Sequence, residues 1–241
     1  MSNPYQAPEY QNPYAQIAEA APATERVAFI RSTYLHLLGA VLAFIFIDAA
    51  IIGVFGEKLE PMVELVTSGW YWLAFLGAFM VVRWIGDAWA HSGSSRATQY
   101  AGLGLYVLAE SILFIPLLYV ANKYCPGAIQ SAGLVTAIVF LGLTAVVFLT
   151  KADFSFLGPA LAILGFAAIA FIIAAIFLQM PMLGVWFSIA MVVLASGYIL
   201  YSTSNILHHY RTDQPVAASL ALFSSVGLLF WYVLQLFMSQ E

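Results

Sequence analysis

Long apolar runs alternate with short polar segments along most of the chain. The runs cover about residues 34–55, 70–86, 99–121, 131–150, 154–178, 183–204 and 216–238. Each is close to the roughly 20 apolar residues with which an α-helix crosses the hydrocarbon core of a bilayer. The fourth and fifth runs are joined only by the polar turn Lys151-Ala152-Asp153, which predicts an antiparallel hairpin. The pattern therefore predicts an all-α, polytopic membrane protein with seven transmembrane helices.

The first 25 residues have a different composition from the rest. They are rich in Pro, Asn, Gln, Tyr and Ala, and they contain no positive charge and no apolar run. These features exclude a secretory signal peptide and predict a flexible tail, which serves either as a spacer or as a handle for a partner. We therefore expect two parts, a tail over residues 1–25 and a seven-helix membrane domain over residues 26–241.

Composition supports a lipid bilayer as the surroundings of the chain. Of the 241 residues, 63% are hydrophobic and 8% are charged, whereas about 25% of a soluble domain is charged. The 8 Lys and Arg against 12 Asp and Glu leave no basic surface for nucleic acid. The one cysteine, Cys125, excludes an internal disulfide and a thiolate metal cluster.

The positive charges predict the orientation of the bundle, because short loops rich in Lys and Arg stay in the cytoplasm. One side of the membrane has six of them and the opposite side has two: Arg26, Arg31, Arg83, Arg96, Lys151 and Arg211 against Lys58 and Lys123. With seven spans, we expect a cytoplasmic N-terminus and an external C-terminus.

Three ionisable residues fall inside predicted spans, where an unpaired charge costs several kcal/mol. Glu110 lies at the middle of its span, about 16 Å from either end. Desolvation favours the neutral form of a carboxyl group, so Glu110 could gain and lose a proton near physiological pH. Asp48 lies about 10 Å from the end of its span, and Arg83 either snorkels to the headgroups or turns inward to a carboxylate. We expect Glu110, Asp48 and Arg83 to form an ion path or a proton sensor, the alternative being buried charges that only fix packing.

The sequence gives little support for a metal site, an enzyme active site or a cofactor site. The four histidines, His36, His91, His208 and His209, fall at or beyond helix ends and predict no metal site. Zinc-protease, nucleophile-elbow and P-loop motifs are absent, and the lone GLG at 102–104 lacks the third glycine of a dinucleotide site. An intramembrane serine protease would need a deep histidine. We expect no enzyme activity and no cofactor, with Ca²⁺ at most a permeant ion.

Four segments resemble the Bax inhibitor-1 family, also called the TMBIM or YccA-like family. They are FIRSTYLHLLGAVLAF at 29–44, KADFSFLGPAL at 151–161, LASGYILYSTSNIL at 194–207 and AASLALFSSVGLLFWYVLQLF at 217–237. The resemblance implies a bundle whose last helix is surrounded by the other six. It also implies a pH-sensitive calcium leak, gated by an aspartate at the end of the sixth helix and another in the seventh. Here Ser202 and Ser225 occupy those two positions, and a serine does not titrate in the working range.

The sequence YSTSNI at 201–206 resembles the YccA branch of the family more than the calcium-leak branch. Members of this branch are bacterial inner-membrane proteins associated with a membrane-anchored ATP-dependent protease, as its substrate and modulator. An unstructured tail suits that role, because a processive protease needs a loose end to grip. Two functional hypotheses remain, an ion leak with Glu110 as sensor and a non-transporting modulator of a protease.

Overall fold

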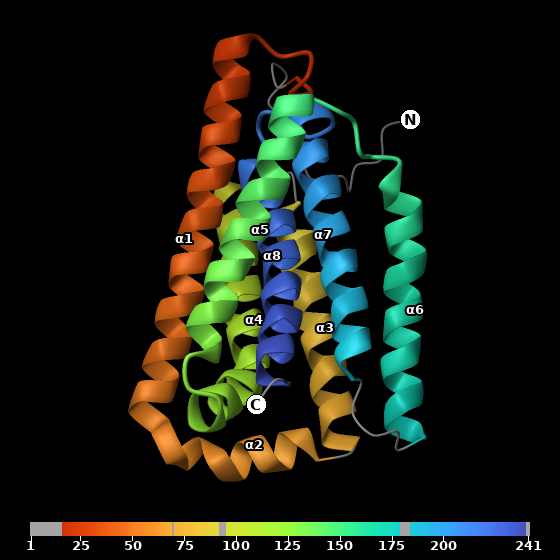
Figure 1. The fold of residues 1–241 in the computed structure, drawn as a ribbon. Helices are drawn as coiled ribbons and strands as arrows, with labels where there is room; N and C mark the ends of the chain where they lie inside the picture. Colours follow the sequence, from red (N-terminus) through yellow and green to blue (C-terminus); the bar gives the residue numbers. More distant parts are fainter. Residues whose placement is uncertain (1–15, 69, 92–94, 179–183, 240–241) are drawn as a thin grey trace, which may run out of the picture.

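The computed structural model describes residues 16–68, 70–91, 95–178 and 184–239. Over these residues the chain folds into a bundle of long helices (Figure 1). They are α1 (Ala23–Phe55), a 3-10 turn (Gly56–Leu59), α2 (Glu60–Thr67), α3 (Trp70–Ala90), α4 (Arg96–Tyr124), α5 (Ala128–Thr150), α6 (Leu157–Phe177), α7 (Val185–His208) and α8 (Pro215–Met238). Within the described ranges, seven helical segments are long and apolar enough to span a membrane. The predicted all-α, seven-span fold is confirmed.

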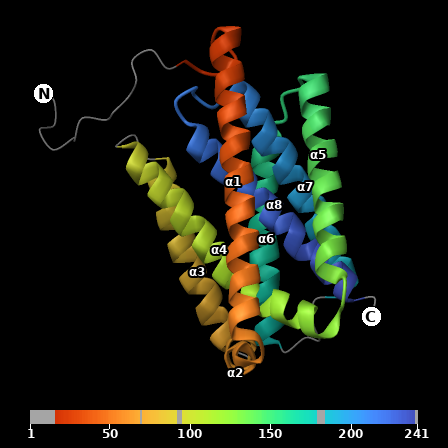
Figure 2. The same cartoon turned by 90° about the vertical axis from the view of Figure 1, so that its left-hand side faces the viewer.

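Two helices, α4 and α8, form the centre of the bundle. Of the most apolar stretch of each span, 67% is buried in α4 and 61% in α8, against 33% or less in the other spans. Helix α8 packs against α1, α3, α4, α5 and α7, and it runs through the middle of the bundle in Figures 1 and 2. The last helix is thus central, as expected, although α6 packs mainly on α7. The sequence of α6 explains its outer place, because it contains no polar side chain that needs a partner in the protein.

A short helix that the sequence pattern does not predict closes one end of the bundle. Helix α2 lies across this end between α1 and α3 (Figure 1), in a segment read from sequence only as a polar break. Val63 of α2 and Leu59 of the preceding 3-10 turn are buried, and they cluster with Ile115 and Tyr119 of α4. The Nζ of Lys123 donates to Glu60 Oε1 at 2.7 Å, which ties α2 to α4. The result is an amphipathic helix, apolar toward the bundle and charged outward.

Helix α1 begins at Ala23, well before the apolar run that starts near residue 34. Residues 1–15 of the expected tail lie outside the described residues. The next residues contact the loop between α7 and α8: the amide of Ala18 donates to the carbonyl of Tyr210 at 2.8 Å, and the amide of Thr212 donates to the carbonyl of Gln16 at 3.0 Å. Ala18 is fully buried. The chain immediately before α1 is therefore docked on the bundle.

Helices α3 and α4 approach closely at two glycines. They run side by side in Figure 2, with Gly86 facing Gly102. A Cβ added at Gly102 would lie 2.6 Å from the amide nitrogen of Ala90 and 2.6 Å from the carbonyl oxygen of Gly86. Since only glycine lacks a Cβ, the backbones reach this separation only with glycine at 102. The GLG at 102–104 thus contains a packing residue.

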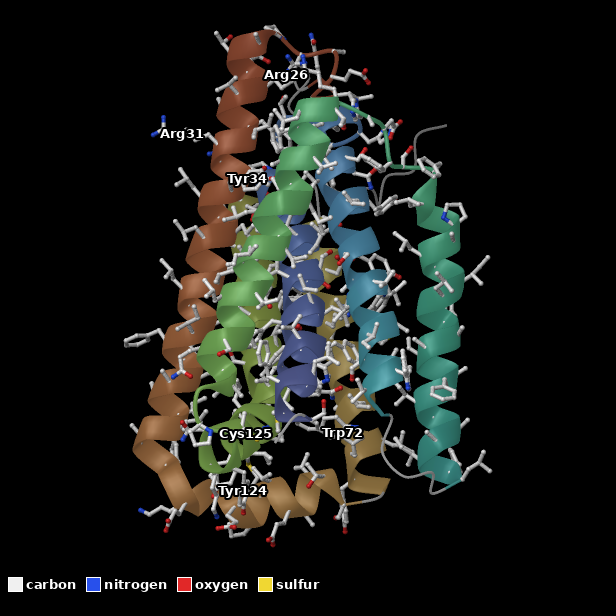
Figure 3. The ribbon with its side chains drawn as sticks, viewed as in Figure 1. Arg26, Arg31, Tyr34, Trp72, Tyr124 and Cys125 are labelled. Carbon is white, nitrogen blue, oxygen red and sulfur yellow. The ribbon has the colours of Figure 1, made fainter. Side chains whose placement is uncertain are left out.

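The ends of the bundle differ in charge. Arg26 and Arg31 lie at the end where α1 begins, and Tyr124 and Cys125 lie at the opposite end (Figure 3). Three further positive charges lie at the end where α1 begins. Arg96 starts α4, Lys151 follows α5, and Arg211 lies in the α7–α8 loop. A cytoplasmic location of this end remains a prediction from the positive charges.

Candidate functional site

Arg83 of α3 turns its guanidinium group into the bundle. Its Nη2 donates to the Oγ of Ser224 on α8 at 2.8 Å. Its guanidinium carbon lies 5.6 Å from the centre of the Tyr106 ring on α4, within the range of a cation–π interaction. Among the described residues, Arg83 has no ion pair with a carboxylate. Arg83 therefore contacts a serine and an aromatic ring and not a carboxylate, and the residue as a whole is exposed.

Glu110 lies on α4 and faces Gly227 of α8. It lies at the middle of a helix of 29 residues and is only 5% exposed. A Cβ added at Gly227 would lie 2.6 Å from Glu110 Oε1, so the glycine makes room for the carboxyl group. The other oxygen, Oε2, is buried and receives no hydrogen bond from the described residues. The protein thus encloses this carboxyl group without supplying a donor to Oε2.

Asp48 of α1 is a second buried carboxyl group. It is 4% exposed, and neither of its oxygens has a hydrogen-bond partner among the described residues. An ionised carboxylate that is buried without donors costs several kcal/mol. Asp48 and Glu110 therefore need a proton, water or a cation to complete their surroundings.

The two positions that carry aspartates in the resembled family meet between α7 and α8. The Oγ atoms of Ser202 and Ser225 are 3.4 Å apart, and both residues are buried. Ser225 also donates to the carbonyl of Ala221 at 2.9 Å, which leaves the Ser202 hydroxyl as the donor between the two serines. The two side chains at these positions lie next to each other. They are hydroxyls, which do not titrate in the working pH range, and not carboxyl groups.

These contacts lie close together along α8. Ser224, Ser225 and Gly227 fall within four consecutive residues, less than about 5 Å of helix rise. Arg83, the serine pair and Glu110 therefore approach α8 at almost one level. Toward the far end of the same helix, Ser188 Oγ of α7 donates to Gln235 Oε1 at 3.2 Å. The core of the bundle is thus polar at more than one depth.

Sequence reasoning missed Tyr106, Ser224 and Gly227. Tyr106 lies one helical turn before Glu110, a spacing that places both on one face of α4. Ser224 and Gly227 fall in the α8 segment that carries the family resemblance. That spacing and that segment were the available signals, but neither names a contact partner.

His91, His208 and His209 lie at or just beyond the ends of α3 and α7, as expected. His36 does not, because α1 begins at Ala23 and His36 lies within this helix. His208 lies 3.6 Å from Glu19 and His209 lies 3.4 Å from Asp153. Across the described residues, no group of three or more His, Cys, Asp or Glu could hold a metal ion.

Two contacts near these helix ends shift a pKa. A hydrogen bond from His91 to Asp87 raises the pKa of His91. The backbone N–H of Ser155 donates to Asp153 Oδ1 at 2.9 Å, and this bond lowers the pKa of Asp153 to about 2. Asp153 also accepts from Ser204 Oγ at 3.2 Å. The loop between α5 and α6 is thereby fixed to the end of α7.

Comparison with known proteins places the chain in a family. The model of the family described as inhibitor of apoptosis-promoting Bax1 matches residues 26–241. An uncharacterized protein of Pseudomonas aeruginosa is 29% identical over 227 residues, which cover 93% of this chain and 95% of the relative. An uncharacterized protein of Pasteurella multocida is 32% identical over 203 residues, 82% of this chain and 83% of the relative.

A further relative has a named activity. The modulator of FtsH protease YccA, from Escherichia coli, is 37% identical over 95 residues, which cover 39% of this chain and 43% of the relative. No solved structure gives a significant match. The family model spans nearly all of the membrane domain, and the Pasteurella relative matches along most of both chains, so this chain belongs to the Bax inhibitor-1 family.

Proposed function

We propose that this protein is a pH-sensitive leak for calcium or protons, with Glu110 as its titrating group. The observation that supports this most is a carboxyl group at the centre of the bundle, 5% exposed, with one oxygen that no described protein group satisfies. A membrane protein that needed Glu110 only for packing would gain from a partner there, because an unsatisfied buried polar group costs free energy. A permeating cation or proton would supply the missing partner.

Asp48 and Arg83 have different roles in the proposed ion path. Asp48 supplies a second buried carboxyl group on α1, and Arg83, fixed by Ser224, supplies the counter-charge. Calcium takes six to eight oxygen ligands, and two carboxylates provide at most four. Hydroxyls, backbone carbonyls and water would have to provide the rest. Such an incomplete ligand set favours brief occupancy, which conduction requires.

The serine pair explains why the sensor would differ from the family's. Ser202 and Ser225 are 3.4 Å apart but cannot change charge in the working pH range. Glu110 and Asp48 are the carboxyl groups buried within the described spans. The pH response would therefore have moved from the α7–α8 contact to the α4–α8 contact.

Flux measurements in liposomes test this function. We expect the reconstituted protein to release trapped calcium or dissipate a proton gradient faster than empty vesicles do, at a rate that changes with pH. Calcium flux should increase toward alkaline pH, because a deprotonated carboxylate attracts a divalent cation and a neutral one does not. Flux equal to that of empty vesicles at every pH would contradict the proposal.

A second function, modulation of a membrane-anchored ATP-dependent protease, has separate support. The relative YccA is named a modulator of FtsH protease and an inner membrane protein. The composition of residues 1–25 also suits a segment that a processive protease grips. In this reading the chain is a multi-pass protein of the bacterial inner membrane with its N-terminus in the cytoplasm, and it binds the protease without conducting ions.

Deletion of residues 2–15 separates the two functions. This variant keeps Gln16 and Ala18, which contact the α7–α8 loop, so the bundle should fold unchanged. We expect the deletion to abolish degradation by the protease and to leave calcium flux within about twofold of the intact protein, since the variant keeps Glu110, Asp48 and every other described residue. Protease degradation and liposome flux are measured on the same preparation. Degradation at the unaltered rate would contradict the role of the tail.

A further inference from the structure

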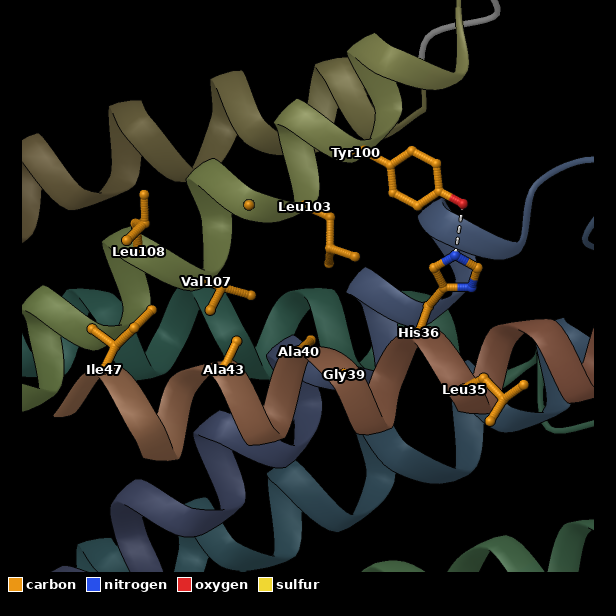
Figure 4. Close-up of a pocket in the computed structure, with 11 residues that line it drawn as sticks. Leu35, His36, Gly39, Ala40, Ala43, Ile47, Tyr100, Leu103, Val107 and Leu108 are labelled. Carbon is orange, nitrogen blue, oxygen red and sulfur yellow. Dashed lines mark hydrogen bonds between the residues drawn. The ribbon is translucent and has the colours of Figure 1, made fainter. Parts of the chain in front are cut away.

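Two adjoining cavities lie between α1 and α4. The first has a volume of about 500 Å³ and is lined by α1 from Leu35 to Ile47 and by α4 from Tyr100 to Leu108 (Figure 4). The second, of about 330 Å³, lies toward the start of α4 and also reaches the α7–α8 loop. His36 and Tyr100 line both cavities, and a hydrogen bond of 2.9 Å joins His36 Nε2 to the Tyr100 hydroxyl. The two cavities therefore meet at this pair of residues, and together they are called here the α1–α4 groove.

The first cavity is apolar and lies on the outside of the bundle. Apart from His36 and Tyr100, its lining consists of aliphatic residues and glycine. Gly39 and Gly104 contribute to the hollow, because a Cβ added at either would meet nothing within 4 Å. The cavity extends from Leu35 to Ile47 along α1, about 18 Å of helix rise. This length exceeds one leaflet of a hydrocarbon core about 30 Å thick.

The second cavity is polar and contains both signs of charge. Its lining includes Arg96, Gln99, Glu25 and Asp213. Asp213 accepts from Arg211 at 3.2 Å, whereas Glu25 has no ion pair among the described residues. An arginine and a separate carboxylate thus line the polar cavity next to the apolar one, close to the start of α4.

We propose that the α1–α4 groove binds one phospholipid whose headgroup carries a phosphate and a primary ammonium, as in phosphatidylethanolamine. One acyl chain occupies the apolar cavity, and the phosphate pairs with Arg96 near the N-terminus of α4. The ammonium donates to Glu25. An anionic headgroup without the amine would face Glu25 unfavourably, and a trimethylated amine could not donate a hydrogen bond to it.

The size of the groove favours a lipid chain over a helix of another protein. A helix about 10 Å wide and about 18 Å long occupies roughly 1,400 Å³, more than the empty space of about 930 Å³ at the apolar cavity. A single acyl chain is far thinner than a helix. The polar cavity beyond His36 and Tyr100 would also have no counterpart on the apolar surface of a transmembrane helix.

Lipid retention by the full chain tests the proposal. The protein is reconstituted in vesicles with equal amounts of phosphatidylethanolamine, phosphatidylglycerol and phosphatidylcholine, extracted in mild detergent, and analysed for bound lipid by mass spectrometry. We expect phosphatidylethanolamine to be enriched over the other two. Gly39→Leu with Gly104→Leu fills the groove and should lower bound lipid by roughly tenfold, through lost apolar contact. The matched control is Gly53→Leu with Gly142→Leu, since added Cβ atoms there also meet nothing and both residues lie outside the groove.

Two charge variants test the headgroup assignment. Arg96→Gln should reduce retention of all three lipids by roughly tenfold, because a charge-assisted bond to phosphate is lost. Arg31→Gln, an exposed residue of α1 outside the groove, should have no effect. Glu25→Gln should keep the lipid but remove the preference for phosphatidylethanolamine over phosphatidylglycerol. Equal retention of all three lipids by the unaltered protein would overturn the headgroup assignment, and unchanged retention after filling the groove would overturn the site.

Discussion

Replacing Glu110 with glutamine is expected to abolish the pH dependence of flux. The amide has nearly the same shape as the carboxyl group, so it fits beside Gly227, but it cannot ionise. A site that loses about 1.4 kcal/mol of cation attraction already loses tenfold in rate, and one full charge at contact distance is worth more than this inside a protein. Calcium flux through Glu110→Gln liposomes should therefore fall at least about tenfold at alkaline pH and show no response to pH.

Glu64→Gln provides the matched control for this variant. It makes the same chemical change on α2, at an exposed position outside the core, and should conduct like the unaltered protein. A Glu110→Gln protein that folds, reconstitutes and retains the full pH response would show that the sensor is another group. Asp48→Asn would then be the next variant to measure.

Replacing Gly102 with alanine is expected to destabilise the bundle by about 1–3 kcal/mol, the usual cost of overpacking. The new Cβ would lie 2.6 Å from two backbone atoms of α3 and 2.9 Å from the Cβ of Trp89. None of these is the free end of a flexible side chain, so α3 must shift as a unit. Thermal unfolding in detergent should report a lower Tm, and the Arg83–Ser224 contact should weaken because Arg83 moves with α3.

Gly104→Ala makes the same change two residues away with the opposite expectation. A Cβ at Gly104 meets nothing within 4 Å, and alanine favours a helix over glycine by up to about 1 kcal/mol. This variant should be as stable as the original or more stable. Equal Tm values for the two alanine variants would mean that α3 and α4 do not approach as closely as Gly86 and Gly102 indicate.

The spans were readable from sequence because a bilayer imposes a strong and local requirement. Every backbone polar group must bond within its own helix, and about 20 apolar residues must follow one another. Helix α2 gives no such signal, since Val63 is its one buried residue and lies within a charged stretch. The early start of α1 was hidden for a related reason: Glu25, Arg26 and Arg31 interrupt the apolar pattern before the membrane begins.

The candidate site was only partly readable. The depth of Glu110 followed from counting residues to the helix ends, and its burial agrees with that count. The partner of Arg83 did not follow, because Ser224 is 141 residues away along the chain and no local pattern links the two. The space that Gly227 leaves for Glu110 could not be predicted from the sequence either. A glycine in an apolar helix looks alike in sequence whether it faces a carboxyl group or lipid.

The central position of α8 has a consequence for the order in which the protein is made. Chains are synthesised from the N-terminus, so α1, α3, α4, α5 and α7 are translated before the helix against which they pack. Until α8 enters, Arg83 lacks Ser224, Ser202 lacks Ser225, and Glu110 has no Gly227 beside it. The polar faces of the bundle are therefore complete only after the last span has been inserted, which makes assembly of the core a late event in biogenesis.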